Sequence, residues 1–247
     1  MLMKMIGVIP ARYDSVRFPG KLLEKISGIP VIVHTYNNVK KMNLLDEVIV
    51  ATEHEKISQS LKEFNIPFIV TSSYHESGTD RIAEAIKNIP CEVVINIQGD
   101  EPFLPKEGLE KIYKAFKNDE KKEIQVASLM TPLVSEEEIS NPNNVKVICK
   151  KNNEALYFSR SVIPFNRSGK GNQYFKHLGV YAFRKKTLLE FVNLPKSDLE
   201  ETEKLEQLRL LENNYSIKMF TTQQSSIGID TPEDLEKAIK FYQENHA

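Results

Sequence analysis

An α/β fold with a mostly parallel sheet is predicted by two patterns that alternate along the first part of the chain. Short apolar runs that suit buried strands take turns with one-faced helical patterns. Units of this size indicate parallel strands joined by right-handed crossovers. The apolar runs are residues 5–9, 47–52, 68–70 and 93–97. The last run is almost entirely apolar, which suits a strand covered on both faces of the sheet.

The first unit reads as strand, cationic loop and helix. The run 5–9 is expected to stop at Pro10, which has no N–H to donate to a sheet ladder. A polar loop at residues 10–21 follows, and residues 30–40 are expected to form a helix.

Helical stripes identify the next two units. Ile57, Leu61 and Phe64 stand at i, i+4 and i+7 and predict one buried helical face. A second stripe, just before the fourth strand, is made by Ile82, Ala83, Ala85 and Ile86.

The chain becomes richer in strands from about residue 124, and this half is expected to be mixed or antiparallel. Strands are predicted at 124–133, 145–150, 155–160, 177–183 and 217–221, with a helix near 203–212. Lys117–Glu123 is interpreted as a solvated loop. The last helix is expected to begin at Thr231-Pro232-Glu233-Asp234, with a buried stripe of Leu235, Ala238, Ile239 and Tyr242. We therefore predict one domain over residues 1–247 with a strand-rich insertion at about 124–200.

Composition excludes several classes of protein. The 247 residues carry 33 Lys and Arg against 34 Asp and Glu, a formal net charge of −1 without a basic block, which argues against a nucleic-acid binder. No apolar run reaches the length of a membrane span, and the N-terminal stretch does not suit a signal peptide. Cys91 and Cys149 have no metal-site spacing and are interpreted as reduced core thiols of a cytoplasmic protein.

Ligands of open parallel sheets bind beyond the carboxyl ends of the strands, so the segments after the strands are candidate sites. The first loop carries Arg12, Ser15, Arg17 and Lys21 but has neither a P-loop nor a dinucleotide motif. These cations precede a predicted helix N-terminus, where backbone N–H groups favour an anion. A phosphate site is one interpretation, and a solvated loop with incidental charge is the other.

Two acids follow predicted strands or precede a helix. Asp100 directly follows the fourth strand, and Asp230 stands ahead of the last helix. A carboxylate at such an edge suits Mg²⁺, which takes one or two carboxylates together with water and phosphate oxygens. Each acid could instead form a turn or a helix cap.

The second half carries a mixed set of cation, imidazole, phenol, carboxylate and amide groups. Its candidates are Arg160, His177, Tyr181, Glu206 and Gln207. Such a set would suit a polyhydroxylated, acidic small molecule, with arginine clamping a carboxylate. For His177 and Tyr181 a packing role is the alternative.

Eight motifs together carry a family resemblance over nearly the whole chain. In order between residues 8 and 235 they are VIPARYDSVRFPGK, SGTDR, NIQGDEP, NPNNVKV, ALYFSR, KHLGVYAF, EKLEQLRLLE and GIDTPEDL. The set resembles the 3-deoxy-manno-octulosonate cytidylyltransferases, the CMP-Kdo synthetases. The resemblance implies a Rossmann-like nucleotidyltransferase fold, a magnesium-dependent reaction of CTP with 3-deoxy-manno-octulosonate (Kdo), a homodimer and a role in lipopolysaccharide synthesis.

The resemblance also implies roles for particular residues. It assigns Arg12, Ser15, Arg17, Lys21, Ser77 and Arg81 to the nucleotide, Asp100 and Asp230 to magnesium, and Gln98, Arg160, His177, Tyr181, Glu206 and Gln207 to the sugar acid. Arg12, Lys21 and Asp100 are the predicted catalytic residues. The expected mechanism is in-line attack of the sugar's anomeric hydroxyl on the α-phosphorus, driven by positioning and charge neutralisation.

Three alternatives remain at this stage. A cytidylyltransferase for 8-amino-Kdo or sialic acid would share the base-side and metal residues. A glycosyltransferase of similar fold would need an acid pair such as D-x-D, where this chain reads Gly99-Asp100-Glu101. A non-catalytic nucleotide-sensing module would bind CTP without releasing pyrophosphate.

Overall fold

The computed structural model describes residues 3–15, 17–223 and 227–246. The chain divides into two compact units: unit 1 comprises residues 1–106 and 226–247, and unit 2 comprises residues 107–225. The strand-rich stretch predicted at about 124–200 falls inside unit 2. That it is an insertion in a single domain stays a prediction.

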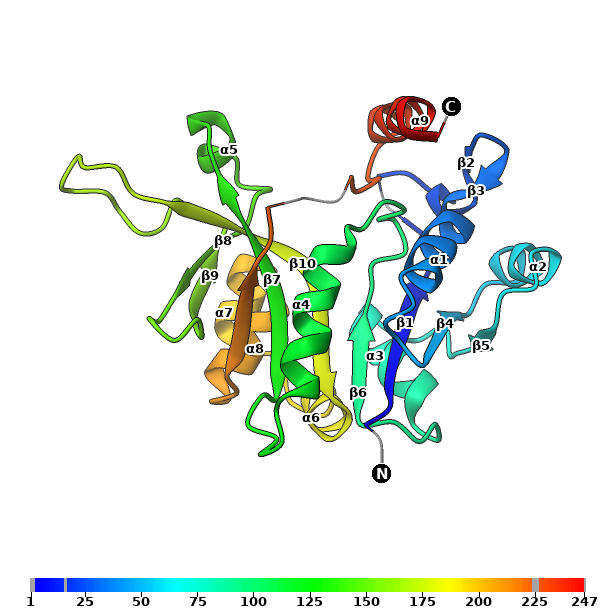
Figure 1. The fold of residues 1–247 in the computed structure, drawn as a ribbon, viewed down its shortest axis with the longest axis horizontal. Helices are drawn as coiled ribbons and strands as arrows, with labels where there is room; N and C mark the ends of the chain where they lie inside the picture. Colours follow the sequence, from blue (N-terminus) through cyan, green and yellow to red (C-terminus); the bar gives the residue numbers. More distant parts are fainter. Residues whose placement is uncertain (1–2, 16, 224–226, 247) are drawn as a thin grey trace. The chain divides into compact units, whose positions relative to one another are not determined.

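Unit 1 contains a parallel sheet, as the alternation of patterns predicts (Figure 1). The strand order is β6 (Val93–Asn96), β1 (Met5–Ala11), β4 (Glu47–Thr52) and β5 (Phe68–Val70), and every neighbouring pair is parallel. The helices between these strands are α1 (Val31–Lys41), α2 (Glu55–Glu63) and α3 (Gly78–Ile86). The mixed α/β architecture with mostly parallel pairing is confirmed.

Two details of unit 1 differ from expectation. The strand β1 continues through Pro10, which pairs with Ala51. This is possible because the ladder of β1 with β6 ends at Val8, so only the β4 side of Pro10 is paired. Phe64 lies beyond α2 with 40% of its surface exposed, so it does not extend the buried stripe of Ile57 and Leu61.

Shorter elements complete unit 1. The loop after β1 leads into the 3-10 turn η1 (Lys21–Leu23) and a small hairpin of β2 (Lys25–Ile26) and β3 (Ile29–Pro30).

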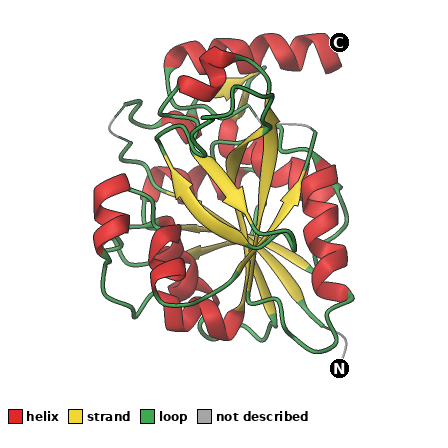
Figure 2. Ribbon diagram, turned by 90° about the vertical axis from the view of Figure 1, so that its left-hand side faces the viewer, coloured by secondary structure: helices red, strands yellow, loops and turns green. Residues whose placement is uncertain are grey.

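The last helix, α9 (Pro232–His246), runs to the C terminus in Figure 2. Its predicted start is confirmed, since Thr231 Oγ1 accepts from the Asp234 N–H at 3.3 Å. The buried stripe predicted for this helix is confirmed only at Ala238. Leu235, Ile239 and Tyr242 are partly exposed.

Unit 2 is a mixed sheet, as predicted for the strand-rich half. The long strand β10 (Tyr174–Arg184) pairs antiparallel with β7 (Val126–Leu133), and β11 (Ile217–Thr221) is parallel to β7. The strands β8 (Lys146–Cys149) and β9 (Ala155–Ser159) form an antiparallel pair beside β10.

The helices of unit 2 depart further from the sequence-based expectation. They are α4 (Lys106–Lys117), which begins at the unit boundary, α5 (Glu136–Ser140), α6 (Lys185–Phe191), α7 (Asp198–Glu203) and α8 (Gln207–Glu212). The helix expected near 203–212 is confirmed for α8 but wrong at its start, which lies four residues later than expected. Lys204 adopts a left-handed conformation with φ of +53° and ends α7 before α8 begins.

The loop Lys117–Glu123 is more than a solvated connection. The carboxylate of Asp119 accepts from Arg184 Nη2 at 2.7 Å and from the N–H groups of Glu123 and Ile124, both at 2.9 Å. Only 8% of the Asp119 side chain is exposed. The prediction is therefore wrong for this residue, whose partner Arg184 lies too far along the sequence to give a local signal.

Two further predictions concern the cysteines and the membrane. Neither Cys91 nor Cys149 is fully buried, so they are not core residues in the sense expected. None of the helices in the described part of the chain is long and apolar enough to cross a bilayer.

Candidate active site

A cavity of about 350 Å³ in unit 1 collects the residues predicted for the nucleotide and the metal. Its lining includes Arg12, Ser15, Arg17, Lys21, Ser77, Arg81, Asp100 and Asp230. Gln98, predicted for the sugar acid, lines the same cavity. The walls are therefore supplied by the segments after β1 and β6, the start of α3 and the segment ahead of α9.

The cationic loop is anchored by an aromatic stack and closed by a backbone hydrogen bond. The ring of Tyr13 lies on His54 with centroids 4.1 Å apart and an angle of 13° between the planes. Gly20 donates its N–H to the Tyr13 carbonyl at 3.0 Å and has φ of +73°, a conformation that glycine adopts without strain. This closed turn brings both ends of the loop, Arg12 and Lys21, to the cavity.

Asp100 and Asp230 converge on one cation. Lys21 Nζ contacts Asp100 Oδ2 and lies 3.0 Å from Asp230 Oδ1, and only 11% of the Lys21 side chain is exposed. Arg17 Nη2 lies 3.0 Å from the other carboxylate oxygen of Asp230. The two acids are thus brought together as predicted.

The backbone ties the two acid-bearing segments to each other. Ile229, which is fully buried, donates its N–H to the Asp100 carbonyl at 3.0 Å. The Asp230 N–H is held by Asp234 Oδ2 at 3.3 Å. The convergence of Asp100 and Asp230 therefore follows from the fold of unit 1 and is not left to side-chain rotamers alone.

This pair of carboxylates fits a hard divalent cation on chemical grounds. Two neighbouring carboxylates offer negatively charged oxygen donors, which are the ligands that Mg²⁺ prefers. Among the described residues no cluster of three or more histidine, cysteine or acidic side chains suits a metal. A metal held by Asp100 and Asp230 would therefore need substrate oxygens and water to complete its coordination.

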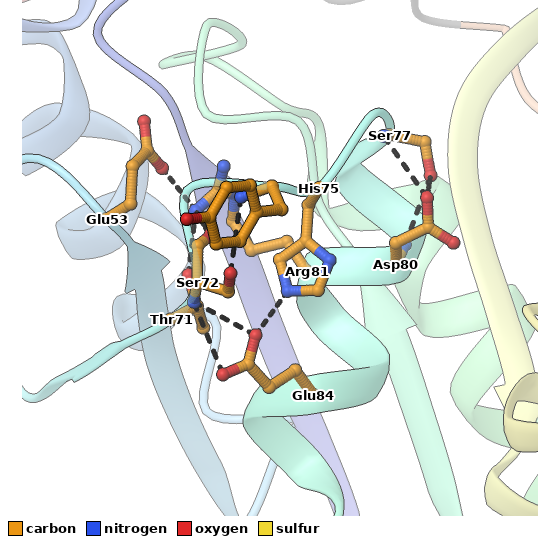
Figure 3. Close-up of polar contacts among 9 residues, drawn as sticks. Glu53, Thr71, Ser72, His75, Ser77, Asp80, Arg81 and Glu84 are labelled. Carbon is orange, nitrogen blue, oxygen red and sulfur yellow. Dashed lines mark hydrogen bonds and ion pairs between the residues drawn. The ribbon is translucent and has the colours of Figure 1, made fainter.

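Another part of the cavity lining comes from the start of α3, whose polar contacts are drawn in Figure 3. Ser77 caps this helix through a reciprocal arrangement with Asp80, whose backbone N–H donates to Ser77 Oγ at 3.1 Å. Arg81, only 4% exposed, donates to Thr71 Oγ1 at 2.7 Å and contacts the carboxylate of Glu53. Burial lowers the pKa of Arg81, while the charge of Glu53 opposes this effect. Glu53 therefore compensates a buried guanidinium that faces the cavity.

In unit 2 the structure places His177 and Tyr181 side by side on β10. Their ring centroids are 5.2 Å apart, and His177 Nε2 lies 3.1 Å from Ser128 Oγ. Burial, with a smaller effect of the Lys176 charge, lowers the pKa of His177 to about 3. The imidazole is thus neutral at physiological pH.

Tyr181 has a buried hydroxyl without a partner. Within residues 3–15, 17–223 and 227–246, nothing forms a hydrogen bond with the Tyr181 hydroxyl or with Gln207 Nε2. Burial, with the charge of Glu206, raises the pKa of Tyr181 well above its usual value. The neighbouring Glu206 is held by Arg209 Nη2 at 3.2 Å. Four of the predicted sugar-acid residues thus occur as two pairs, His177 with Tyr181 and Glu206 with Gln207.

Arg160 has partners of its own in unit 2. Its Nε donates to the Glu203 carbonyl at 2.8 Å and its Nη1 to the Pro142 carbonyl at 3.2 Å.

The fully buried Lys146 donates to the Asn141 carbonyl at 3.0 Å. Burial lowers the pKa of Lys146. The charge of Glu203 opposes this shift in part, and the charge of Arg160 adds to it. Sequence reasoning missed Lys146, because nothing in its local sequence marks it as buried.

Sequence reasoning also missed part of the cavity of unit 1. His75 lines the cavity and Glu53 holds Arg81, yet neither was a candidate. The position of His75, two residues before Ser77, could have pointed to it. Glu53 follows the predicted strand 47–52, which is the kind of segment where sites occur, but its partner Arg81 is not visible in the sequence.

Comparison with known proteins defines the class to which this chain belongs. Residues 6–219 match the sequence profile of the cytidylyltransferase family. The chain is 50% identical over 237 residues to the 3-deoxy-manno-octulosonate cytidylyltransferase of Flavobacterium johnsoniae, covering 96% of this chain and 97% of the relative. It is 48% identical over 239 residues to the enzyme of the same name from Christiangramia forsetii, covering 96% of each.

A solved structure agrees with these relatives. A CMP:2-keto-3-deoxy-manno-octonic acid synthetase complexed with CTP superposes with a TM-score of 0.93 at 38% identity, covering 98% of this chain and 99% of the other. The chain belongs to the cytidylyltransferase family. Its fold is that of the nucleotidyltransferases, as the resemblance of the motifs predicts.

Proposed function

We propose that this protein transfers a cytidylyl group from CTP to Kdo, giving CMP-Kdo and pyrophosphate for lipopolysaccharide synthesis. One observation supports this more than any other. Every residue predicted from the motifs for nucleotide and metal lines one cavity of unit 1. The names of the full-length relatives, and the CTP in the similar solved structure, support the choice of nucleotide and sugar acid.

In the proposed reaction the anomeric hydroxyl oxygen of Kdo forms a bond to the α-phosphorus of CTP. The bond from this phosphorus to the oxygen that bridges it to the β-phosphorus breaks, and pyrophosphate leaves with the electron pair. Arg12, Arg17 and Lys21 would hold the triphosphate, because guanidinium and ammonium groups neutralise the charge on oxygens in flight. The hydroxyl proton would be lost to solvent.

Asp100 and Asp230 are the residues proposed to hold Mg²⁺. The ion would supply charge neutralisation on the phosphates and lower the pKa of the attacking hydroxyl. Lys21 contacts both acids in the structure. We expect its ammonium group to leave them and bind the phosphates of the nucleotide, since all three side chains line one cavity.

We propose that the unit 2 residues Arg160, His177, Tyr181, Glu206 and Gln207 bind the sugar acid. Gln98, which the motifs also assign to the sugar acid, lines the cavity of unit 1. Within the part of the chain that the structure describes, the Tyr181 hydroxyl and the Gln207 amide nitrogen have no hydrogen-bond partner. This supports the proposal, because buried polar groups are nearly always hydrogen-bonded. Hydroxyl groups of a sugar could supply the missing partners. Arg160 would bind the carboxylate through donors other than its Nε and Nη1 contacts.

We further propose a cytoplasmic homodimer that associates through unit 2. Large apolar side chains are exposed there, among them Val134 at 88% and Phe165 at 86%. Exposed apolar surface of this kind is typical of protein interfaces. Light scattering after size-exclusion chromatography is expected to give twice the 28.3 kDa of one chain, and a monomer at all concentrations would contradict the dimer.

Pyrophosphate release from CTP and Mg²⁺ with a panel of sugar acids tests the substrate. We expect turnover with Kdo and much lower kcat/KM with 8-amino-Kdo and sialic acid. A preference for either of these would overturn the choice of Kdo but keep the cytidylyl transfer. CTP binding without pyrophosphate release from any sugar acid would point to a nucleotide-sensing module.

A further inference from the structure

We propose that Glu84 is a positioning residue of the nucleotide site, which acts by holding His75 and the chain segment on either side of it. This inference rests on the proposed binding of CTP in the cavity of unit 1. Glu84 itself does not line that cavity, whereas His75, Glu76, Ser77 and Gly78 do. An effect of Glu84 on CTP must therefore pass through these residues.

The segment between β5 and α3 is the part of the wall that Glu84 holds (Figure 3). Glu84 lies on α3, and its carboxylate accepts from the Ser72 N–H at 3.0 Å. The same carboxylate contacts His75 Nε2. One side chain thus joins the helix to two points of the segment that leads to the cavity.

Arg81, one turn earlier on α3, holds the same segment. It donates to Thr71 Oγ1 at 2.7 Å and lies 3.5 Å from the Ser72 carbonyl. The N–H and the carbonyl of Ser72 are thus engaged by two side chains of α3, Glu84 and Arg81. Side chains three residues apart on a helix lie on the same face, so both can reach one short segment.

The contact between Glu84 and His75 holds a ring that lines the cavity. Only 19% of the His75 side chain is exposed, and its Nε2 faces the carboxylate of Glu84. Because the Glu84 carboxylate accepts a hydrogen bond from His75 Nε2, it sets the orientation of a ring that lines the cavity. The hydrogen bond to His75 is the largest cause that lowers the pKa of Glu84, so this carboxylate is charged at physiological pH.

Loss of the contacts of Glu84 with Ser72 and His75 is expected to weaken CTP binding without slowing the chemical step. Glu84→Ala removes the acceptor of the Ser72 N–H and of His75, which frees the wall segment. A lost hydrogen bond to a charged group corresponds to about a tenfold change in an equilibrium constant. We therefore expect the KM for CTP to rise about tenfold, with kcat at saturating CTP and the KM for Kdo within about twofold of the unaltered protein.

Three comparisons separate positioning from a general structural effect. Glu84→Gln keeps an acceptor oxygen, so it is expected to restore most of the CTP affinity that Glu84→Ala loses. The double variant His75→Ala with Glu84→Ala is expected to be no worse than the poorer single variant, because coupled residues are not additive. Glu47→Ala removes a surface ion pair with Lys4 elsewhere in unit 1 and is expected to leave both KM values unchanged.

The outcome that overturns the inference is a CTP KM for Glu84→Ala within twofold of the unaltered protein. Equal rises in both KM values, together with a lower melting temperature and no rescue by Glu84→Gln, would also overturn it. Arg12→Ala is measured alongside. If Arg12→Ala raises the KM for CTP and Glu84→Ala does not, only the role of Glu84 fails, whereas no effect of either variant would contradict the nucleotide cavity itself.

Discussion

Each unit of the molecule holds carboxylates beside a buried cation, and the two arrangements differ in what surrounds them. In unit 1, Lys21 is shared between Asp100 and Asp230 at the wall of a cavity. In unit 2, Asp119 accepts from Arg184 and from two backbone N–H groups, and the Arg184 guanidinium also lies over the ring of Phe116 at 5.0 Å. Asp119 is saturated by hydrogen bonds from protein groups, whereas the two acids of unit 1 share Lys21, and Asp230 has Arg17 as a second partner.

This difference separates a structural ion pair from a candidate site. A saturated carboxylate has no need of a ligand, so Asp119 contributes to stability. Asp100 and Asp230 are held by the cationic side chains of Lys21 and Arg17, which another cation can replace, so the two acids are suited to a metal. Removing the charge of Asp100 or Asp230 should therefore affect turnover, and removing the charge of Asp119 should affect stability.

The largest expected effect is on catalysis. Asp100→Asn should lower kcat by about 100-fold or more, because an electrostatic contact to the transition state is lost. The free energy of unfolding should change little, since Lys21 keeps Asp230 as a partner. Steady-state pyrophosphate release and urea unfolding measure the two quantities. Glu101→Gln, a neighbour that does not line the cavity, is the matched control, and unchanged turnover in Asp100→Asn would remove this residue from the metal site.

A smaller effect, of the opposite kind, is expected in unit 2. Asp119→Asn should lower the free energy of unfolding by about 2 kcal/mol at pH 7, since hydrogen bonds to a charged acceptor are weakened. The kcat of the folded enzyme should be retained. The exposed Glu120→Gln in the same loop is the control.

The stability difference for Asp119 should also depend on pH. Burial alone would raise the pKa of Asp119, but hydrogen bonds from Ile124, Arg184 and Glu123 outweigh it, and the pKa is lowered. A lowered pKa means that the stabilisation is present above the unfolded value of about 3.9 and is lost as the pH falls through the folded value. Urea unfolding at pH 7 and at pH 3 should show the difference shrinking. A constant difference would assign it to packing and not to charge.

The smallest predicted effect concerns the loop that carries Lys21. Gly20→Ala should cost about 1 kcal/mol of stability, because alanine at φ of +73° is strained and its Cβ would lie 3.3 Å from the ring of Tyr13. Gly171→Ala, at a glycine with open space around its Cβ position, is the control. Equal melting temperatures for the two variants would show that the turn tolerates a side chain.

Sequence patterns predicted the frame of the fold because periodicity and strand order act locally. The four parallel strands of unit 1 and the Thr231 cap were readable in this way. The break at Lys204 was not, since a left-handed residue other than glycine gives no composition signal. Phe64 continued a helical period, but the helix had already ended at Glu63.

The candidate site was predictable to the extent that its residues follow strands or precede helices. Arg12, Lys21, Asp100 and Asp230 do so, and the structure brings them to one cavity. The partners that hold the wall, such as Glu53 for Arg81 and Glu84 for His75, depend on how the chain folds back. Such pairings are set in three dimensions and leave no spacing in the sequence.

Anomalous X-ray scattering from crystals grown with Mn²⁺ and CTP tests most directly whether Asp100 and Asp230 hold a divalent cation in exchange for Lys21. We predict a manganese peak bound by both carboxylates, with Lys21 Nζ moved away from them and onto the phosphates. A manganese ion bound by phosphate oxygens alone, with Lys21 still in contact with both acids, would contradict the account.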